Sequence, residues 1–88
     1  MEIRLSQKYY RSLNQFVKKN KRNAESTKKA LSFFKANSNH PSLHLEKLSG
    51  SKLWTVRIDK SNRIFFSWIN KTTALFLDIG KHDKYRKY

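Results

Sequence analysis

The residues whose types could support catalysis lie in the last third of the chain. Arg57 and Arg63 stand six residues apart, on either side of an expected turn. His82 stands two residues after Gly80, just past the end of an expected strand, and Tyr85 comes three residues later. Arginine can hold a phosphate through two parallel hydrogen bonds and offset charge that grows on it in a transition state. Histidine titrates near neutral pH and can transfer a proton.

Together these residue types favour cleavage of RNA, in which the RNA 2′-OH is the nucleophile and tyrosine stacks on a base or binds a phosphate. Arg57 and Arg63 share one face of a hairpin only if its loop has an odd number of residues. Simpler interpretations exist as well. The arginines could be charges on a solvated sheet face, His82 an exposed tail residue, and Tyr85 and Tyr88 tethers for the tail.

The sequence argues against a metal or a bound cofactor. His40, His44 and His82 are spread over three regions without metal-binding spacing or an acidic cluster. Gly50 and Gly80 are the only glycines, too few for a dinucleotide-binding motif or a P-loop. The chain has no cysteine, which excludes thiolate nucleophiles and fits a reducing cytosol. We therefore expect no metal and no cofactor.

The charge favours polyanionic partners. Twenty Lys and Arg residues against six Asp and Glu residues give a formal net charge of +14. Nucleic acid, the ribosome or an acidic protein would complement this charge. The N-terminus lacks the apolar stretch of a signal peptide, and no apolar run approaches the roughly 20 residues that cross a bilayer. We expect a cytoplasmic protein with no membrane partner.

Apolar residues recur with the spacing of helices in two segments and of strands in four. Ser6 and Asn23 are the expected N-caps of the two helices. The segment 43–52 is expected to be irregular. The predicted strands are 2–6, 53–58, 63–69 and 73–80, and the predicted helices are 7–19 and 24–36.

This element order predicts an α+β fold in a single domain, residues 1–88. A short N-terminal strand and a helical hairpin precede a three-stranded antiparallel meander, with both helices on one face of a four-stranded sheet. The other face is left open, and the site is expected there. The strand residues expected to face the core are Trp54, Val56, Ile58, Ile64, Phe66, Trp68, Leu75, Leu77 and Ile79.

The C-terminal half resembles the RelE/ParE toxin superfamily of type II toxin–antitoxin systems, and more closely its RelE-type mRNA interferase branch. A K-L-x-G lead-in stands at Lys47–Gly50, and a Trp-containing strand with a basic end follows at 53–58. Arg63–Phe66 provides the arginine-led strand, and Asp78–Tyr85 closes on Gly-Lys-His. These anchors span about residues 45–86, and the strand–helix–helix order covers the rest of the chain.

The resemblance implies ribosome-associated cleavage of mRNA by 2′-OH attack, with a cyclic phosphate product, and neutralisation by an acidic antitoxin. It implies phosphate binding by Arg57 and Arg63, a general acid at His82, and orientation or stacking by Tyr85. The expected catalytic residues are thus Arg63, His82 and Tyr85, and the expected RNA-binding residues are Arg57, Lys52, Lys81 and Lys84.

The resemblance leaves the general base without an assigned residue. Related toxins supply a carboxylate upstream of the K-L-x-G segment. Glu46 stands near that place, either in this role or only as a partner of Lys47 or Lys52. Two other functions stay open, because they fit the same charge: a ParE-like toxin that inhibits DNA gyrase without ribonuclease activity, and a non-catalytic basic RNA-binding module.

Overall fold

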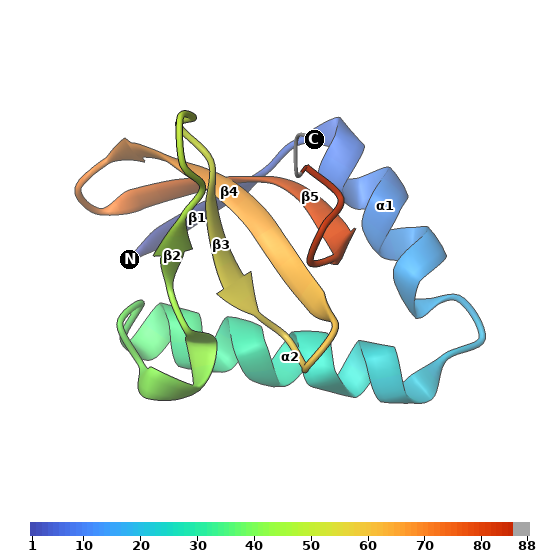
Figure 1. Cartoon of the computed structure of the whole chain (residues 1–88). Coiled ribbons are helices and arrows are strands. Elements are labelled where there is room, and N and C mark those ends of the chain that lie inside the picture. Colours follow the sequence, from blue (N-terminus) through green and yellow to red (C-terminus); the bar gives the residue numbers. More distant parts are fainter. Residues whose placement is uncertain (86–88) are drawn as a thin grey trace.

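A mixed sheet of five strands, in the order β1-β5-β4-β3-β2, forms the centre of the computed structural model, which describes residues 1–85 (Figure 1). β1 is parallel to β5, and the other neighbouring strands are antiparallel. The elements are β1 (Glu2–Leu5), α1 (Gln7–Val17), α2 (Lys21–Ala36), the short 3-10 helix η1 (Pro41–Leu43), β2 (Glu46–Lys47), β3 (Trp54–Arg57), β4 (Asn62–Asn70) and β5 (Thr73–Lys81). The predicted α+β fold and its meander are confirmed.

The sheet has one strand more than predicted. Glu46 and Lys47 pair with Thr55 and Trp54, so part of the segment expected to be irregular is the edge strand β2. A strand of two residues is too short to show an alternating pattern, and only its pairing with β3 reveals it.

The helices begin at asparagine and serine caps. The Ser6 hydroxyl accepts the N–H of Tyr9 at 3.0 Å, as predicted. The second helix begins earlier than predicted, because Asn20 rather than Asn23 is its cap. The Asn20 side chain accepts the N–H of Asn23 at 3.0 Å. The Asn23 side chain instead donates to the Phe16 carbonyl at 2.8 Å and so links the two helices.

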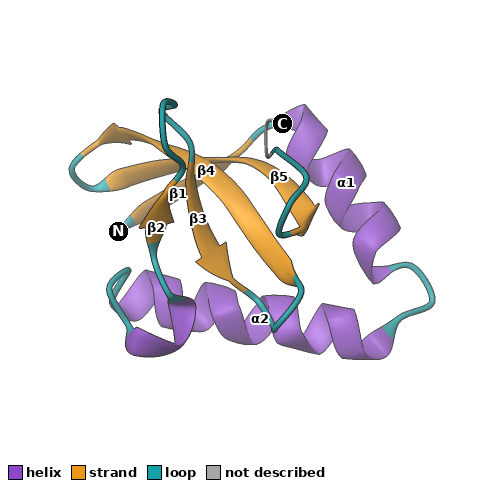
Figure 2. Ribbon diagram, in the orientation of Figure 1, coloured by secondary structure: helices purple, strands orange, loops and turns teal. Residues whose placement is uncertain are grey.

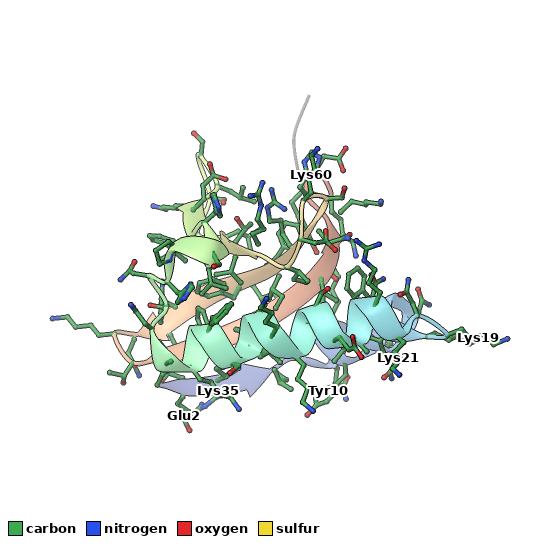
Figure 3. All side chains as sticks on the ribbon, turned by 90° about the horizontal axis from the view of Figure 1, so that it is seen from below. Glu2, Tyr10, Lys19, Lys21, Lys35 and Lys60 are labelled. Carbon is green, nitrogen blue, oxygen red and sulfur yellow. The ribbon has the colours of Figure 1, made fainter. Side chains whose placement is uncertain are left out.

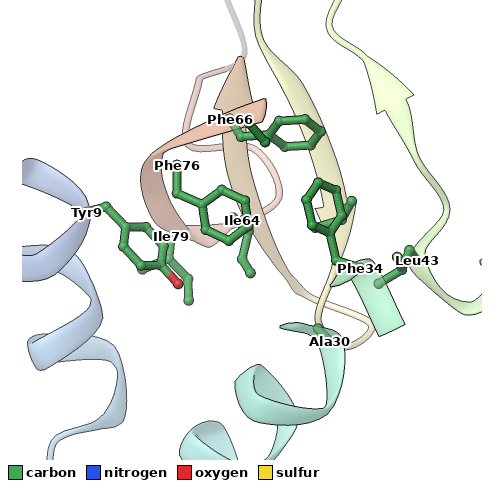
Figure 4. Packing of buried hydrophobic residues seen from close by; sticks show 10 residues of the cluster. Tyr9, Ala30, Phe34, Leu43, Ile64, Phe66, Phe76 and Ile79 are labelled. Carbon is green, nitrogen blue, oxygen red and sulfur yellow. The ribbon is translucent and has the colours of Figure 1, made fainter. Parts of the chain in front are cut away.

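Both helices pack on the same face of the sheet, as predicted (Figure 2). Phe34 of α2 lies at the centre of the core, with ring centroids 5.2 Å from Phe66 and 5.5 Å from Phe76 (Figure 4). Tyr9 of α1 packs edge-on against Phe76 at 5.4 Å. The buried core consists of Tyr9, Ala30, Phe34, Leu43, Val56, Ile64, Phe66, Ala74, Phe76 and Ile79.

The core face of β5 differs from the prediction. Ala74 and Phe76 belong to the buried core, whereas Leu75 and Leu77 are half-buried and lie outside it. Ile79 faces the core as predicted. Residues 76 and 79 are three apart, so the period of two is interrupted between them.

A β-bulge causes this change. Phe66 pairs with Phe76, but Phe65 pairs with Asp78, which leaves Leu77 as an extra residue on β5. The alternation restarts after Leu77 with the opposite phase. The bulge therefore turns Asp78 to the face away from the helices, where Phe65 also lies.

The loop between β3 and β4 has the odd number of residues that places Arg57 and Arg63 on the same face of the sheet. Arg57 pairs directly with Arg63, so the loop is residues 58–62, an odd number. The Asp59 carboxylate accepts the N–H groups of Ser61 and Asn62, both at 2.9 Å, and stabilises the turn. The side chains of both arginines thus project from the open face of the sheet.

Exposed lysines such as Lys19, Lys21, Lys35 and Lys60 project from the outside of the molecule (Figure 3). Across residues 1–85, neither helix has the length and apolar character needed to cross a membrane.

Candidate active site

A cavity of about 450 Å³ lies on the open face of the sheet. It brings together Arg63 of β4, His82 and Tyr85 of the tail, and Glu46 of β2. The three predicted catalytic residues therefore meet at one place. The complete lining is Glu46, Lys47, Leu48, Ser49, Thr55, Arg63, His82 and Tyr85.

Arg63 is held by the turn that precedes it. Its Nη1 donates to the carbonyl oxygens of Asp59 at 2.9 Å and Asn62 at 3.0 Å. Within residues 1–85, Nε and Nη2 have no hydrogen-bond partner and can bind a phosphate. Burial and the charge of Arg57 lower the pKa of Arg63, while Glu46 and Asp59 act in the opposite direction. An arginine stays protonated even so.

His82 is placed by the backbone of the tail. Its N–H donates to the Ser61 carbonyl at 2.8 Å, and the Lys84 N–H donates to the Lys81 carbonyl at 3.0 Å. The tail thus forms a turn that places both His82 and Tyr85 at the cavity. Gly80 is needed at its start, because its φ is +157° and a Cβ there would lie 3.3 Å from the Lys84 side chain.

Tyr85 lines the cavity with its ring, while its hydroxyl points elsewhere. The ring packs edge-on against Phe65, with centroids 4.9 Å apart. The hydroxyl donates to the Asp78 carboxylate at 2.5 Å and accepts from the Lys8 ammonium at 2.6 Å. The ring is therefore placed for stacking, but the hydroxyl already has two partners. Tyr88, the other expected tether, lies outside the described residues.

Glu46 is the site residue for which the sequence left two roles open, a general base or an ion-pair partner of a lysine. It pairs with Thr55, which puts its carboxylate on the same face as Arg63. The predicted alternative, an ion pair with Lys47 or Lys52, does not form in the described part of the chain. Leu45 packs against the core, so the next residue, Glu46, faces the other way.

Arg57 lies beside Arg63 but lines a second, smaller cavity of about 240 Å³. This cavity reaches across the sheet edge to Lys29 and Phe33 of α2. The Arg57 Nη1 is 3.3 Å from Nε2 of His44. The arginine pair thus connects two adjacent hollows rather than lining one.

The structure brings none of the three predicted RNA-binding lysines to the main cavity. Lys84 points to the Asp78 carboxylate, 3.0 Å from its ammonium. Gly80 pairs with Arg63, which lines the cavity, and Lys81 pairs with Asn62. Because neighbouring residues of a strand face opposite sides of the sheet, Lys81 faces away from the cavity. Lys52 is exposed in the loop before β3.

The cavity offers a carboxylate, a guanidinium group and an imidazole from three separate segments. Such a set can remove a proton, stabilise negative charge and supply a proton at one reacting centre. No group of three or more metal-ligating side chains occurs among residues 1–85.

Solved toxin structures share this fold. The YoeB/ParE toxin from Agrobacterium tumefaciens matches with a TM-score of 0.76 over 93% of this chain and 99% of that chain, at 14% identity. A chain of the YoeB–YefM complex from Staphylococcus aureus matches with a TM-score of 0.72 over 93% and 97%, at 16% identity. A chain of the E. coli DinJ–YafQ toxin–antitoxin complex matches with a TM-score of 0.75 over 98% and 97%, at 13% identity.

No protein-family model matches the sequence, and no curated protein sequence matches it significantly. At 13–16% identity the structural likeness shows the fold. The chain has the fold of the YoeB and YafQ toxins. The fold that the resemblance to RelE/ParE toxins predicted is therefore confirmed.

Proposed function

We propose that this chain is the toxin of a type II toxin–antitoxin system and cleaves mRNA on the ribosome in the cytoplasm. The observation that carries the proposal is the meeting of Glu46, Arg63 and His82 at one cavity. The toxin fold and the net charge of +14 support it, because both suit a protein that binds RNA.

In the proposed reaction, Glu46 takes the proton of the RNA 2′-OH, and the resulting oxygen attacks the adjacent phosphorus. The O2′–P bond forms while the P–O5′ bond breaks, and His82 gives a proton to the leaving O5′. The products are a 2′,3′-cyclic phosphate and a 5′-hydroxyl end. Arg63 binds the non-bridging phosphate oxygens through the two nitrogens that the turn leaves free.

Neighbouring residues would position the RNA strand. The Tyr85 ring offers a surface on which a base can stack. Lys47 in the main cavity and Arg57 in the adjacent one are placed to bind the phosphates that flank the cleaved bond. Lys52, Lys81 and Lys84 lie away from the cavity, so they would contribute only long-range attraction.

An acidic antitoxin is the second proposed partner. The solved neighbours include complexes of YoeB with YefM and of YafQ with DinJ. A surplus of 14 positive charges on this chain would favour fast association with an acidic chain. Such a partner would silence the toxin by covering the basic open face.

The test is controlled expression of the full chain, followed by growth curves and mapping of mRNA 5′ ends. Arg63→Ala and His82→Ala should each abolish growth arrest and mRNA cleavage while circular dichroism shows an unchanged fold. Arg11→Ala, which removes the same charge from an exposed position of α1, should stay fully toxic. Normal toxicity of both cavity variants would contradict the proposal.

The same experiment separates the other two functions. Growth arrest with uncut mRNA, a DNA-damage response and stalled supercoiling would identify a gyrase inhibitor. Salt-sensitive RNA binding without growth arrest would identify a non-catalytic RNA-binding module.

A further inference from the structure

One carboxylate on the open face is fully buried, and the cavity chemistry does not use it. Asp78 has no exposed surface. Its Oδ2 accepts from the Tyr85 hydroxyl at 2.5 Å, and its Oδ1 accepts from the Lys84 ammonium at 3.0 Å and from the Ile79 N–H at 2.9 Å. The Lys8 ammonium of α1 lies 3.6 Å from Oδ2.

These contacts keep Asp78 ionised in a place that otherwise disfavours charge. Burial alone would raise the pKa of this carboxyl. Hydrogen bonds from Ser12, Tyr85, Lys84 and the Ile79 N–H outweigh burial and lower the pKa to about 2. The buried Asp78 carboxylate therefore stays negatively charged and binds the ammonium groups of Lys84 and Lys8 and the hydroxyl of Tyr85.

The groups that bind there come from the two ends of the chain. Lys8 stands in the first turn of α1, and its ammonium also lies 5.1 Å from the centre of the Tyr85 ring. Lys84 and Tyr85 belong to the tail, which returns beside the start of α1 (Figure 1). We call Asp78, Lys8, Lys84 and Tyr85 the Asp78 latch.

His82 itself has few contacts with the rest of the protein. His82 is exposed, and its own fixed contact is one backbone hydrogen bond to Ser61. The next strong attachments along the tail are Lys84 and Tyr85, which both bind Asp78. Without the contacts of Lys84 and Tyr85 with Asp78, residues 82–85 would be hydrogen-bonded to the β3–β4 hairpin only through the His82 N–H, which donates to the Ser61 carbonyl.

We infer that Asp78 is a positioning residue, which holds the tail turn and thereby keeps His82 at the cavity that Arg63 also lines. Asp78 does not contact the RNA, and it acts only through Tyr85, Lys84 and Lys8. The catalytic consequence rests on the proposed ribonuclease function, whereas the anchoring of the tail does not.

The decisive variant is Lys8→Met in the full chain, because Lys8 is 58% exposed and its loss should not disturb folding. We expect the NMR signals of the His82 ring to shift and broaden and the backbone of residues 82–85 to become mobile. RNA cleavage should fall about 10-fold in kcat with little change in KM, since a small misplacement of a catalytic group lowers the rate. Lys8→Arg should restore both properties.

Lys28→Met removes the same charge from an exposed position of α2 and should change neither readout. Asp78→Asn should loosen the tail further, and the double variant Lys8→Met/Lys84→Met gives the same test if Asp78→Asn fails to fold. Unchanged His82 signals and unchanged tail mobility in the folded double variant would overturn the inference. If the wild-type chain cleaves no RNA, the proposed function fails, while the NMR readouts still decide whether the latch holds the tail.

Discussion

The two faces of β4 are covered in different ways. On one face Ile64 and Phe66 belong to a continuous apolar core that also contains residues of both helices. On the other face Phe65 packs against the Tyr85 ring, and Arg63 lines the cavity. Apolar burial is non-directional and tolerates small shifts, whereas the contacts of the second face are polar and directional. The helix face therefore supplies most of the stability, and the open face carries the polar groups that line the cavity.

The largest effect that tests this contrast is expected from Phe66→Ala. Phe66 contacts the rings of Phe34 and Phe76, and its truncation should lower the free energy of unfolding by about 3–5 kcal/mol. That is a large share of the stability of a small domain. Phe65→Ala on the same strand should cost less, because the tail that covers it can move, and should mainly release Tyr85. Urea unfolding measures the free energy of unfolding of both variants. Equal losses in Phe66→Ala and Phe65→Ala would show that the two faces of β4 contribute equally to stability.

On the open face, a large effect on catalysis is expected from Glu46→Gln. The amide keeps the size of the side chain but cannot accept the 2′-OH proton, so kcat should fall about 10²- to 10⁴-fold. The urea midpoint should stay unchanged, because Glu46 is exposed on an edge strand. Single-turnover cleavage of a short RNA measures the rate, with exposed Glu25→Gln as the control. Full activity of Glu46→Gln would assign the base to another group.

The same contrast explains how much could be predicted from the sequence. The helix face was predictable because residues such as Ile64 and Phe66 alternate and Tyr9 begins a helical stripe. The bulge at Leu77 was not, because Leu75–Leu77 is apolar throughout and fits either phase of a strand. Only the pairing with β4 selects the phase.

On the open face, residue type and family resemblance pointed to Arg63 and His82, and the structure places both at one cavity. The sequence could not choose between the two roles of Glu46, because its strand exists only through pairing with β3. The Asp78 latch could not be predicted from the sequence for a different reason. It joins side chains 77 residues apart, Lys8 and Tyr85, and no local pattern shows such a contact.

Acid should weaken the open face before the helix face. The pKa of Asp78 is lowered to about 2, below the value of an unfolded chain. The contribution of this carboxylate, on the order of 2 kcal/mol, is therefore fully present above about pH 4 and is lost as the pH falls toward 2. Stability measured by urea between pH 5 and 2 should decline less steeply in Asp78→Asn than in the wild type.

Asp83→Asn, an exposed carboxyl in the same tail, is the matched control and should follow the wild-type curve closely. Asp59 also has a lowered pKa, but it is unchanged in both variants, so the difference between the curves isolates Asp78. A wild-type curve parallel to that of Asp78→Asn would show that the carboxylate adds no stability.

The smallest expected effect is on the helix face, where one polar group is out of place. The Tyr9 hydroxyl is buried without a hydrogen-bond partner among residues 1–85, and burial raises the pKa of Tyr9 to about 12. Tyr9→Phe removes an unsatisfied group and keeps the ring contact with Phe76, so it should stabilise the fold by about 1 kcal/mol. Tyr10→Phe, at a position that is 52% exposed, should change stability by less than about 0.5 kcal/mol. A loss of stability in Tyr9→Phe would mean that the hydroxyl has a partner, and that the helix face also depends on a directional contact.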